Sequence, residues 1–225
     1  MEYALPYRTA TEINSAMGRV YGNMALAVIT SMIVSMFVAS NADLMAFFFT
    51  GIVKWIVIFA PLAAIFAVGY VLGNNPSKVT AQLCLHGFAA LMGLSFATIF
   101  VIYTTASIVN AFLGAAVLFS TMSFYGYFTK KSLDSFGKYL IVGLIAIIIV
   151  SIINIFIGSS ALQMFISAAA VLIFLGLTAY DTQKIREQIM ESSSPAIEAM
   201  GALTLYLDFI NLFLSLLQLF GGRRE

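Results

Sequence analysis

Charged side chains are scarce in this sequence: Asp, Glu, Lys and Arg make up 9% of its 225 residues, against about 25% in ordinary soluble domains. So few charged side chains cannot cover the surface of a soluble fold. Hydrophobic residues reach 61%, which is too high a fraction for a disordered chain. A soluble domain and a disordered segment are both excluded. The composition is that of a membrane protein.

Cysteine and histidine occur once each, as Cys84 and His86. One thiol cannot form an intramolecular disulfide, and the two residues together cannot supply a Cys/His zinc cluster. They lie two positions apart and so point to different faces of a helix, which argues against Cys-His and Ser-His-Asp hydrolases.

The net charge is +1 and no run of Lys and Arg exceeds two residues. The sequence therefore lacks the basic patch of a nucleic-acid-binding protein. We expect no enzyme, no cofactor and no nucleic-acid partner.

Long apolar runs, each near the roughly 20 residues that cross a bilayer as a helix, make up most of the chain. A break at Tyr103–Thr105 separates the third run from the fourth, and without it the count would be six. We count seven, at Val20–Ser40, Trp55–Leu72, Val79–Tyr103, Ala106–Phe128, Tyr139–Ile157, Ala161–Tyr180 and Ala196–Phe220. The prediction is an all-α, polytopic, single membrane domain over residues 1–225. Its parts are an N-terminal segment (1–19), a seven-helix bundle (20–220) and a short tail (221–225).

The basic residues near the ends of the runs predict the orientation, because Lys and Arg resist translocation across the membrane. An N-terminus in the cytoplasm places eight of them inside and three outside. The inner eight are Arg8, Arg19, Lys78, Lys130, Lys131, Lys138, Lys184 and Arg186, and the outer three are Lys54, Arg223 and Arg224. We therefore expect a cytoplasmic N-terminus and a C-terminus outside.

Few ionisable side chains lie within the runs or at their edges, and most have a structural explanation. Lys54 and Glu198 lie at helix starts, where a lysine reaches the headgroups and a carboxylate meets the favourable end of the helix dipole. A neutral, hydrogen-bonded imidazole explains His86, with proton sensing as a minor alternative. Asp208 differs, because it lies deep inside the last run, where an aspartate costs at least about 2.5 to 3.5 kcal/mol. It needs a partner or water.

A polar stripe runs along the last helix through Asp208. Thr204, Asp208, Asn211, Ser215 and Gln218 recur at spacings of four, three, four and three, which places them on one helix face. Such a stripe suits either a water-lined path or hydrogen bonds between helices, and the carboxylate within it favours the path. We interpret Thr204, Asn211, Ser215 and Gln218 as pore-lining residues.

Asp181, at the end of the sixth run, is the expected partner of Asp208. The two lie about thirteen residues either side of a turn near Ser194 and Pro195, hence both roughly 20 Å from it along their helices. The run from Ala161 is already about 30 Å long at Asp181, which alone would place that residue at the cytoplasmic interface. Helix extension and tilt would reconcile the two estimates.

Two close carboxylates cannot both ionise cheaply, so Asp181 and Asp208 should titrate in two steps as a proton switch. Their oxygens could also take a calcium ion. Calcium wants six to eight oxygens, however, and two carboxylates with Asn211, carbonyls and water form a sparse shell, so we expect binding to be weak and transient. The predicted site is thus a pH sensor and gate at Asp181 and Asp208.

Three segments carry a family resemblance. Residues 201–213, GALTLYLDFINLF, resemble the C-terminal signature of the transmembrane Bax inhibitor motif family, also called the Bax inhibitor-1 family. Residues 176–183, GLTAYDTQ, and 123–131, SFYGYFTKK, resemble its bacterial branch. The resemblance implies six helices around a central seventh in a bacterial inner membrane. It also implies a pH-sensitive calcium leak controlled by a di-aspartyl pair, which Asp181 and Asp208 match.

One family feature is missing from this sequence. Some members carry an arginine near the cytoplasmic end of the second helix as a latch to the carboxylates. Residues 69–78 contain no arginine, and Lys78 is the nearest basic residue. Whether Lys78 replaces the latch is open, as are the direction of gating, ion selectivity and oligomeric state.

Three functions compete at this stage. The first is the proton-gated cation leak, with calcium ions, protons and the lipid bilayer as partners. The second is a regulator that binds other membrane proteins, such as a membrane protease, in which the aspartates only hold helices together. The third is an intramembrane aspartyl protease. Tyr180 and Asp181 fit its first motif, but Leu205-Tyr206-Leu207 replaces the Gly-x-Gly that should precede the second aspartate. We favour the leak.

Overall fold

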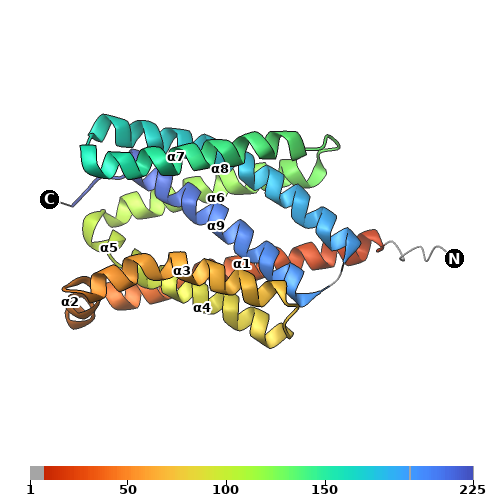
Figure 1. Cartoon of the computed structure of the whole chain (residues 1–225), viewed down its shortest axis with the longest axis horizontal. Coiled ribbons are helices and arrows are strands. Elements are labelled where there is room, and N and C mark those ends of the chain that lie inside the picture. Colours follow the sequence, from red (N-terminus) through yellow and green to blue (C-terminus); the bar gives the residue numbers. More distant parts are fainter. Residues whose placement is uncertain (1–7, 193, 225) are drawn as a thin grey trace. The chain divides into compact units, whose positions relative to one another are not determined.

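The computed structural model of this chain describes residues 8–192 and 194–224, and within these ranges it is helical without a β-strand. Figure 1 shows the helices along the chain. They are α1 (Ala10–Ala39), α2 (Ala42–Phe49), α3 (Val53–Gly73), α4 (Lys78–Phe96), α5 (Ile99–Ile102), α6 (Thr105–Phe128), α7 (Asp134–Ile157), α8 (Ser160–Glu191) and α9 (Pro195–Phe220).

Seven stretches in the described residues are long and apolar enough to span a membrane, α4 and α5 counting together as Lys78–Ile102. The last of them, α9, is the most buried: 72% of its apolar window is buried, against 6% to 39% for the others. The predicted all-α membrane fold is confirmed. The first seven residues of the predicted N-terminal segment, and Glu225 of the predicted tail, lie outside the described residues.

Several helix ends differ from the predicted ones, since hydropathy registers only the apolar part of a helix. α1 begins at Ala10, well before Val20, because Thr9 and Glu12 form a capping box: the Thr9 hydroxyl accepts from the Glu12 amide, and the Glu12 carboxylate accepts from the Thr9 amide. α8 continues past Tyr180 to Glu191, which is the helix extension that the position of Asp181 required.

The weak break between the third and fourth runs is a true helix boundary. Thr104 is the N-cap of α6, and its hydroxyl accepts from the backbone N–H of Ser107 at 3.2 Å. Such a cap satisfies one of the backbone donors that a new helix leaves open. The described residues therefore hold seven candidate spans rather than six.

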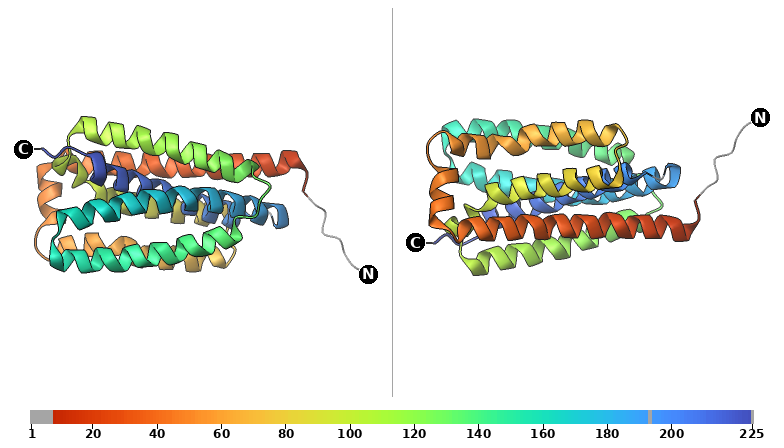
Figure 2. Two further views of the ribbon diagram at one scale, coloured as in Figure 1. Left: turned by 90° about the horizontal axis from the view of Figure 1, so that it is seen from above. Right: turned by 90° about the horizontal axis from the view of Figure 1, so that it is seen from below.

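The described residues form two compact units. The first unit comprises the described residues of Met1–Thr98 and of Lys184–Tyr206. In it α1 and α4 run side by side (Figure 2). They pack closely because Gly93 has no side chain: a Cβ there would lie 2.5 Å from the carbonyl oxygen of Ser31. A small residue at a helix contact is a common device in membranes.

The second unit comprises Ile99–Gln183 and the described residues of Leu207–Glu225. In it α6 packs on α8 where Gly126 meets Ala179, so closely that a Cβ on Gly126 would overlap the carbonyl group of Ala179. α7 packs on α8 in the same way, with the ring of Tyr180 lying over Gly137. Of the seven spans in the described residues, α7 has the least buried apolar window, at 6%, as expected for a helix that faces lipid.

Candidate functional site

A helical hairpin made by α8 and α9 supplies both predicted aspartates. α8 ends at Glu191 and α9 begins at Pro195, which places the turn where the sequence predicted it. Proline suits the first position of a helix, because it lacks only an amide hydrogen that has no partner there. The hydroxyl of Ser194 accepts from the Ile197 amide at 3.2 Å and so caps the new helix.

The carboxyl groups of Asp181 and Asp208 contact each other within the second unit through a side-chain hydrogen bond. Asp208 is 4% exposed, while Asp181 is half-buried. An ionised carboxylate only accepts hydrogen bonds, so one member of such a pair must hold a proton. We call these two residues the carboxyl pair. The pair joins two different helices, α8 and α9.

One oxygen of the pair remains without a partner. Among the residues that the structure describes, the buried Oδ2 atom of Asp208 accepts no hydrogen bond. A buried acceptor without a partner is costly and usually marks a strained or functional group, or a place for water or an ion. The carboxyl pair therefore has spare binding capacity on the side of Asp208.

The two bacterial-type sequence segments of α6 and α8 pack against each other and so fix the position of Asp181. Beside Asp181, the buried hydroxyl of Thr182 lies 2.9 Å from that of Ser123 in α6. Next to it, Gln183 accepts from the Leu133 amide at 2.7 Å and donates to the carbonyl of Lys131 at 3.0 Å. These contacts hold the α8 residues that follow Asp181 against α6 and the loop after it.

Asp208 is positioned by aromatic packing on its neighbour. The ring of Phe209 contacts those of Phe112 and Phe119 in α6, with centroids 5.4 Å and 5.8 Å apart in edge-on geometry. Such pairs add stability beyond the apolar area that they bury. Within the second unit, α6 thus contacts both helices that carry the carboxyl pair.

The polar stripe of α9 is used in more than one way. Asn211 donates to the carbonyl of Leu207 at 2.8 Å, and Ser215 donates to that of Asn211 at 2.7 Å, so both bond along their own helix. Gln218 instead links helices: its side-chain oxygen accepts from Gln163 and Ser167 of α8 at 2.9 Å and 3.1 Å. Thr204 is half-buried in the part of α9 that belongs to the first unit.

Two side-chain pairs of the first unit were not anticipated from the sequence. Tyr206, which is fully buried, places its hydroxyl 2.7 Å from that of Ser31 in α1. Glu198, interpreted above only as a partner of the helix dipole, forms two hydrogen bonds with Arg19 at 2.8 Å and 2.7 Å. No sequence pattern could have found these pairs, because each joins residues far apart in the chain.

Three other ionisable residues lie away from the carboxyl pair's own contacts. Nδ1 of His86 lies 3.0 Å from the Thr30 hydroxyl, and the ammonium group of Lys54 lies 5.2 Å from the ring of Trp55. Lys78 is exposed at the first position of α4. Within the described residues, no group of three or more His, Cys, Asp and Glu side chains could hold a metal ion. Around the carboxyl pair, any further oxygen ligand for calcium would therefore have to be a neutral one.

Comparison with known proteins gives a consistent result. A family model described as "Inhibitor of apoptosis-promoting Bax1" matches residues 13–225. The chain is 40% identical to the inner membrane protein YbhL of Escherichia coli, over 94% of this chain and 93% of that protein. It is 37% identical to an uncharacterized protein of Borreliella burgdorferi, over 94% of each chain. An uncharacterized protein of Rickettsia prowazekii is 36% identical, over 92% of this chain and 89% of its own length.

Proposed function

Because this chain belongs to the Bax inhibitor-1 family of integral membrane proteins, we propose that it is a pH-sensitive leak for calcium and other cations. The carboxyl pair gates the leak. The family match and the E. coli relative support a location in a bacterial inner membrane. The proposed orientation has the N-terminus in the cytoplasm and the C-terminus outside.

The observation that carries this proposal is the direct contact between the carboxyl groups of Asp181 and Asp208. With one shared proton, the contact holds α8 and α9 together. Loss of that proton places two negative charges against each other in a site where Asp208 is almost wholly buried, which favours separation of the carboxylates or entry of a cation. A protonation step thereby biases two arrangements of the hairpin.

The route for the cation follows α9. Asn211 lies about one turn beyond Asp208 and Ser215 another turn on, and both are satisfied within their own helix rather than by a neighbouring one. They can therefore line a path without losing a bond between helices. A shell of two carboxylates and a few neutral oxygens is sparse for calcium. Sparse coordination suits passage rather than storage.

Calcium flux into liposomes tests the proposal. We would reconstitute the purified protein and compare flux at about pH 6 and pH 8, which spans the transition expected of a coupled pair. The wild type should show different rates at the two values, and Asp208→Asn should remove the difference, because an amide cannot release the shared proton. Asp134→Asn is the matched control, since Asp134 is an exposed aspartate at the start of α7.

Two outcomes would contradict the proposal. One is a pH response in Asp208→Asn equal to that of the wild type. The other is flux no greater than in empty liposomes, with protein shown to be folded. If the protein instead acts as a regulator of other membrane proteins, the Asp208→Asn variant should keep that regulatory function, because an amide also forms hydrogen bonds between helices. That result would favour a regulator that binds other membrane proteins, in which the carboxyl pair is only a structural contact.

An intramembrane protease remains the remote alternative. Two carboxyl groups in contact could act as an acid and base pair, but the residues before Asp208 lack the glycines of such enzymes. Members of this family are in general non-enzymatic membrane proteins. Cleavage of a peptide substrate that disappears in Asp208→Asn would be needed to support catalysis.

A further inference from the structure

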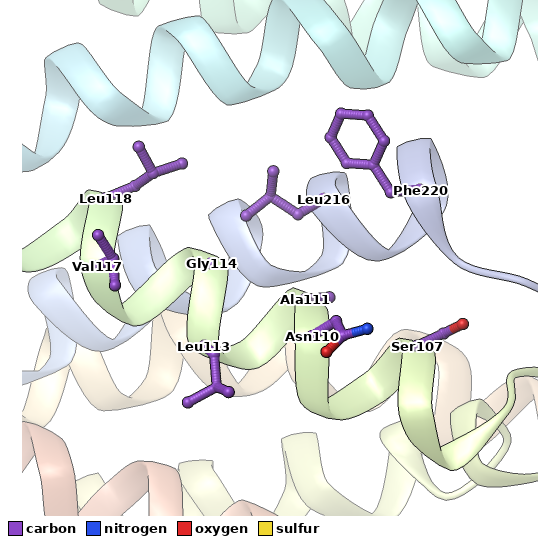
Figure 3. Close-up of a pocket in the computed structure, with 9 residues that line it drawn as sticks. All are labelled: Ser107, Asn110, Ala111, Leu113, Gly114, Val117, Leu118, Leu216 and Phe220. Atoms are coloured by element: carbon purple, nitrogen blue, oxygen red, sulfur yellow. The ribbon is translucent and has the colours of Figure 1, made fainter.

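A groove between α6 and α9 in the second unit has no role in the proposed leak. Its volume is about 570 Å³, within the range of roughly 300 to 1,000 Å³ typical of ligand sites. Figure 3 shows its lining, which is mostly apolar, with Ser107 and Asn110 as the polar residues. Gly114 faces Leu216 across it, because a Cβ there would make an ordinary van der Waals contact with the Leu216 side chain at 3.6 Å. We call this the α6–α9 groove.

The groove opens towards the membrane. Three of the apolar side chains that line it are strongly exposed: Leu113 by 57%, Val117 by 66% and Phe220 by 76%. In a protein that spans a bilayer, exposed apolar side chains face hydrocarbon. An acyl chain can therefore enter the α6–α9 groove from the side.

The length of the groove matches one leaflet. Its lining along α6 extends from Ser107 to Leu118, which corresponds to about 17 Å at 1.5 Å per residue. Half of a hydrocarbon core about 30 Å thick is about 15 Å. One extended acyl chain would fill the groove from the membrane surface towards the midplane.

Two arginines lie at the Ser107 end. The backbone N–H of Gly222 donates to the Ser107 hydroxyl at 2.9 Å, so the chain after α9 folds back onto the start of α6. Arg224 is anchored there through its Nε atom, which donates to the Tyr103 carbonyl at 3.1 Å. Arg223 and Arg224 are both exposed. A guanidinium group has five N–H donors, so an anchored arginine can still bind a phosphate.

We propose that the α6–α9 groove binds one acyl chain of an anionic phospholipid, and that Arg223 and Arg224 bind its phosphate headgroup. The apolar groove and the two positive charges at its polar end fit the two parts of one such molecule. A free phosphate would use only the arginines, and a neutral lipid would use mainly the groove. The proposal does not depend on the leak.

Native mass spectrometry of the full-length protein in detergent tests it directly. The probes are phosphatidylglycerol and phosphatidylcholine with identical acyl chains. We expect the wild type to bind one phosphatidylglycerol molecule at least about fivefold more tightly than phosphatidylcholine. A fivefold difference is the effect of about one basic residue beside an anionic lipid. Arg223→Gln with Arg224→Gln should reduce phosphatidylglycerol to the level of phosphatidylcholine. This double variant lies outside the helices and should fold.

A second variant separates the groove from the charges. Gly114→Leu should fill the groove and weaken binding of both lipids. Gly69→Leu is its matched control, a helical glycine in α3 with no atom within 4 Å of a Cβ, and it should bind as the wild type does. A phosphatidylglycerol with a photoreactive acyl chain should crosslink to residues 107–118.

Three results would overturn the proposal. The first is equal binding of the two lipids to the wild type. The second is a crosslink that maps outside α6 and α9. The third is binding of glycerol phosphate as tight as that of phosphatidylglycerol, because an acyl chain would then contribute nothing. If Gly114→Leu fails to fold, the arginine variant and the crosslink still decide the question.

Discussion

Three polar side chains of α9 find partners on a different helix. Asp208 meets Asp181, Tyr206 meets Ser31, and Gln218 meets Gln163. Inside a membrane no bulk water can take the place of such a partner, so an unpaired polar group is expensive. The carboxyl pair is exceptional because its contact depends on a proton. The other two pairs hold at any physiological pH.

The Tyr206 and Ser31 pair yields an asymmetric prediction. Ser31 also donates to the carbonyl of Ala89 at 2.8 Å, so Tyr206→Phe leaves Ser31 satisfied and should cost about 1 kcal/mol or less. Ser31→Ala leaves the buried Tyr206 hydroxyl without its hydrogen-bond partner and should lower the free energy of unfolding by about 1 to 3 kcal/mol. Unfolding of the purified protein in mixed micelles measures both. A larger loss in Tyr206→Phe than in Ser31→Ala would contradict this account.

The ion pair between Arg19 and Glu198 should contribute little, although its geometry is bidentate. The two side chains are 50% and 17% exposed, and exposed pairs contribute about 0.2 to 1 kcal/mol. Arg19→Gln and Glu198→Gln should each lower the melting temperature slightly, whereas the exchange Arg19→Glu with Glu198→Arg should restore it. The restoration should shrink in high salt. An exchange variant less stable than either single variant would argue against the pair.

At the level of the helices, sequence analysis predicted the number of crossings and the hairpin that carries both aspartates. These predictions succeeded because a membrane crossing requires a run of about 20 mostly apolar residues, and a single polar residue does not interrupt such a run. The ends of α1 and α8 were missed, because both helices continue into polar sequence. The packing of the SFYGYFTKK segment on the GLTAYDTQ segment was also missed, since a sequence cannot show which distant helices touch.

The contact between α6 and α8 gives a prediction at this scale. A methyl group on Gly126 would overlap the carbonyl of Ala179, so Gly126→Ala should destabilise the protein by about 1 to 3 kcal/mol. Gly69→Ala is the control, because space is open there and alanine favours helix over glycine. It should leave stability unchanged or raise it. Equal unfolding free energies for the two variants would show that α6 and α8 do not pack so closely.

For the whole molecule, the distribution of basic residues predicts a cytoplasmic N-terminus. In a Cys84→Ser background, a cysteine at exposed Asp43 should react with a membrane-impermeant maleimide from outside intact spheroplasts. A cysteine at exposed Lys130 should react only after the membrane is broken. Labelling in the opposite pattern would show that the N-terminus lies outside. The proposed lipid site would then lie in the other membrane leaflet.

The central claim is that Asp181 and Asp208 act as one proton switch. The most direct test is the full pH profile of calcium flux for the wild type, Asp181→Asn, Asp208→Asn and the double variant in matched liposomes. Two residues that share one proton should not act additively. We predict a pH-dependent transition in the wild type, and its loss in both single variants and, to the same extent, in the double variant. A double variant that keeps the wild-type profile would contradict the account.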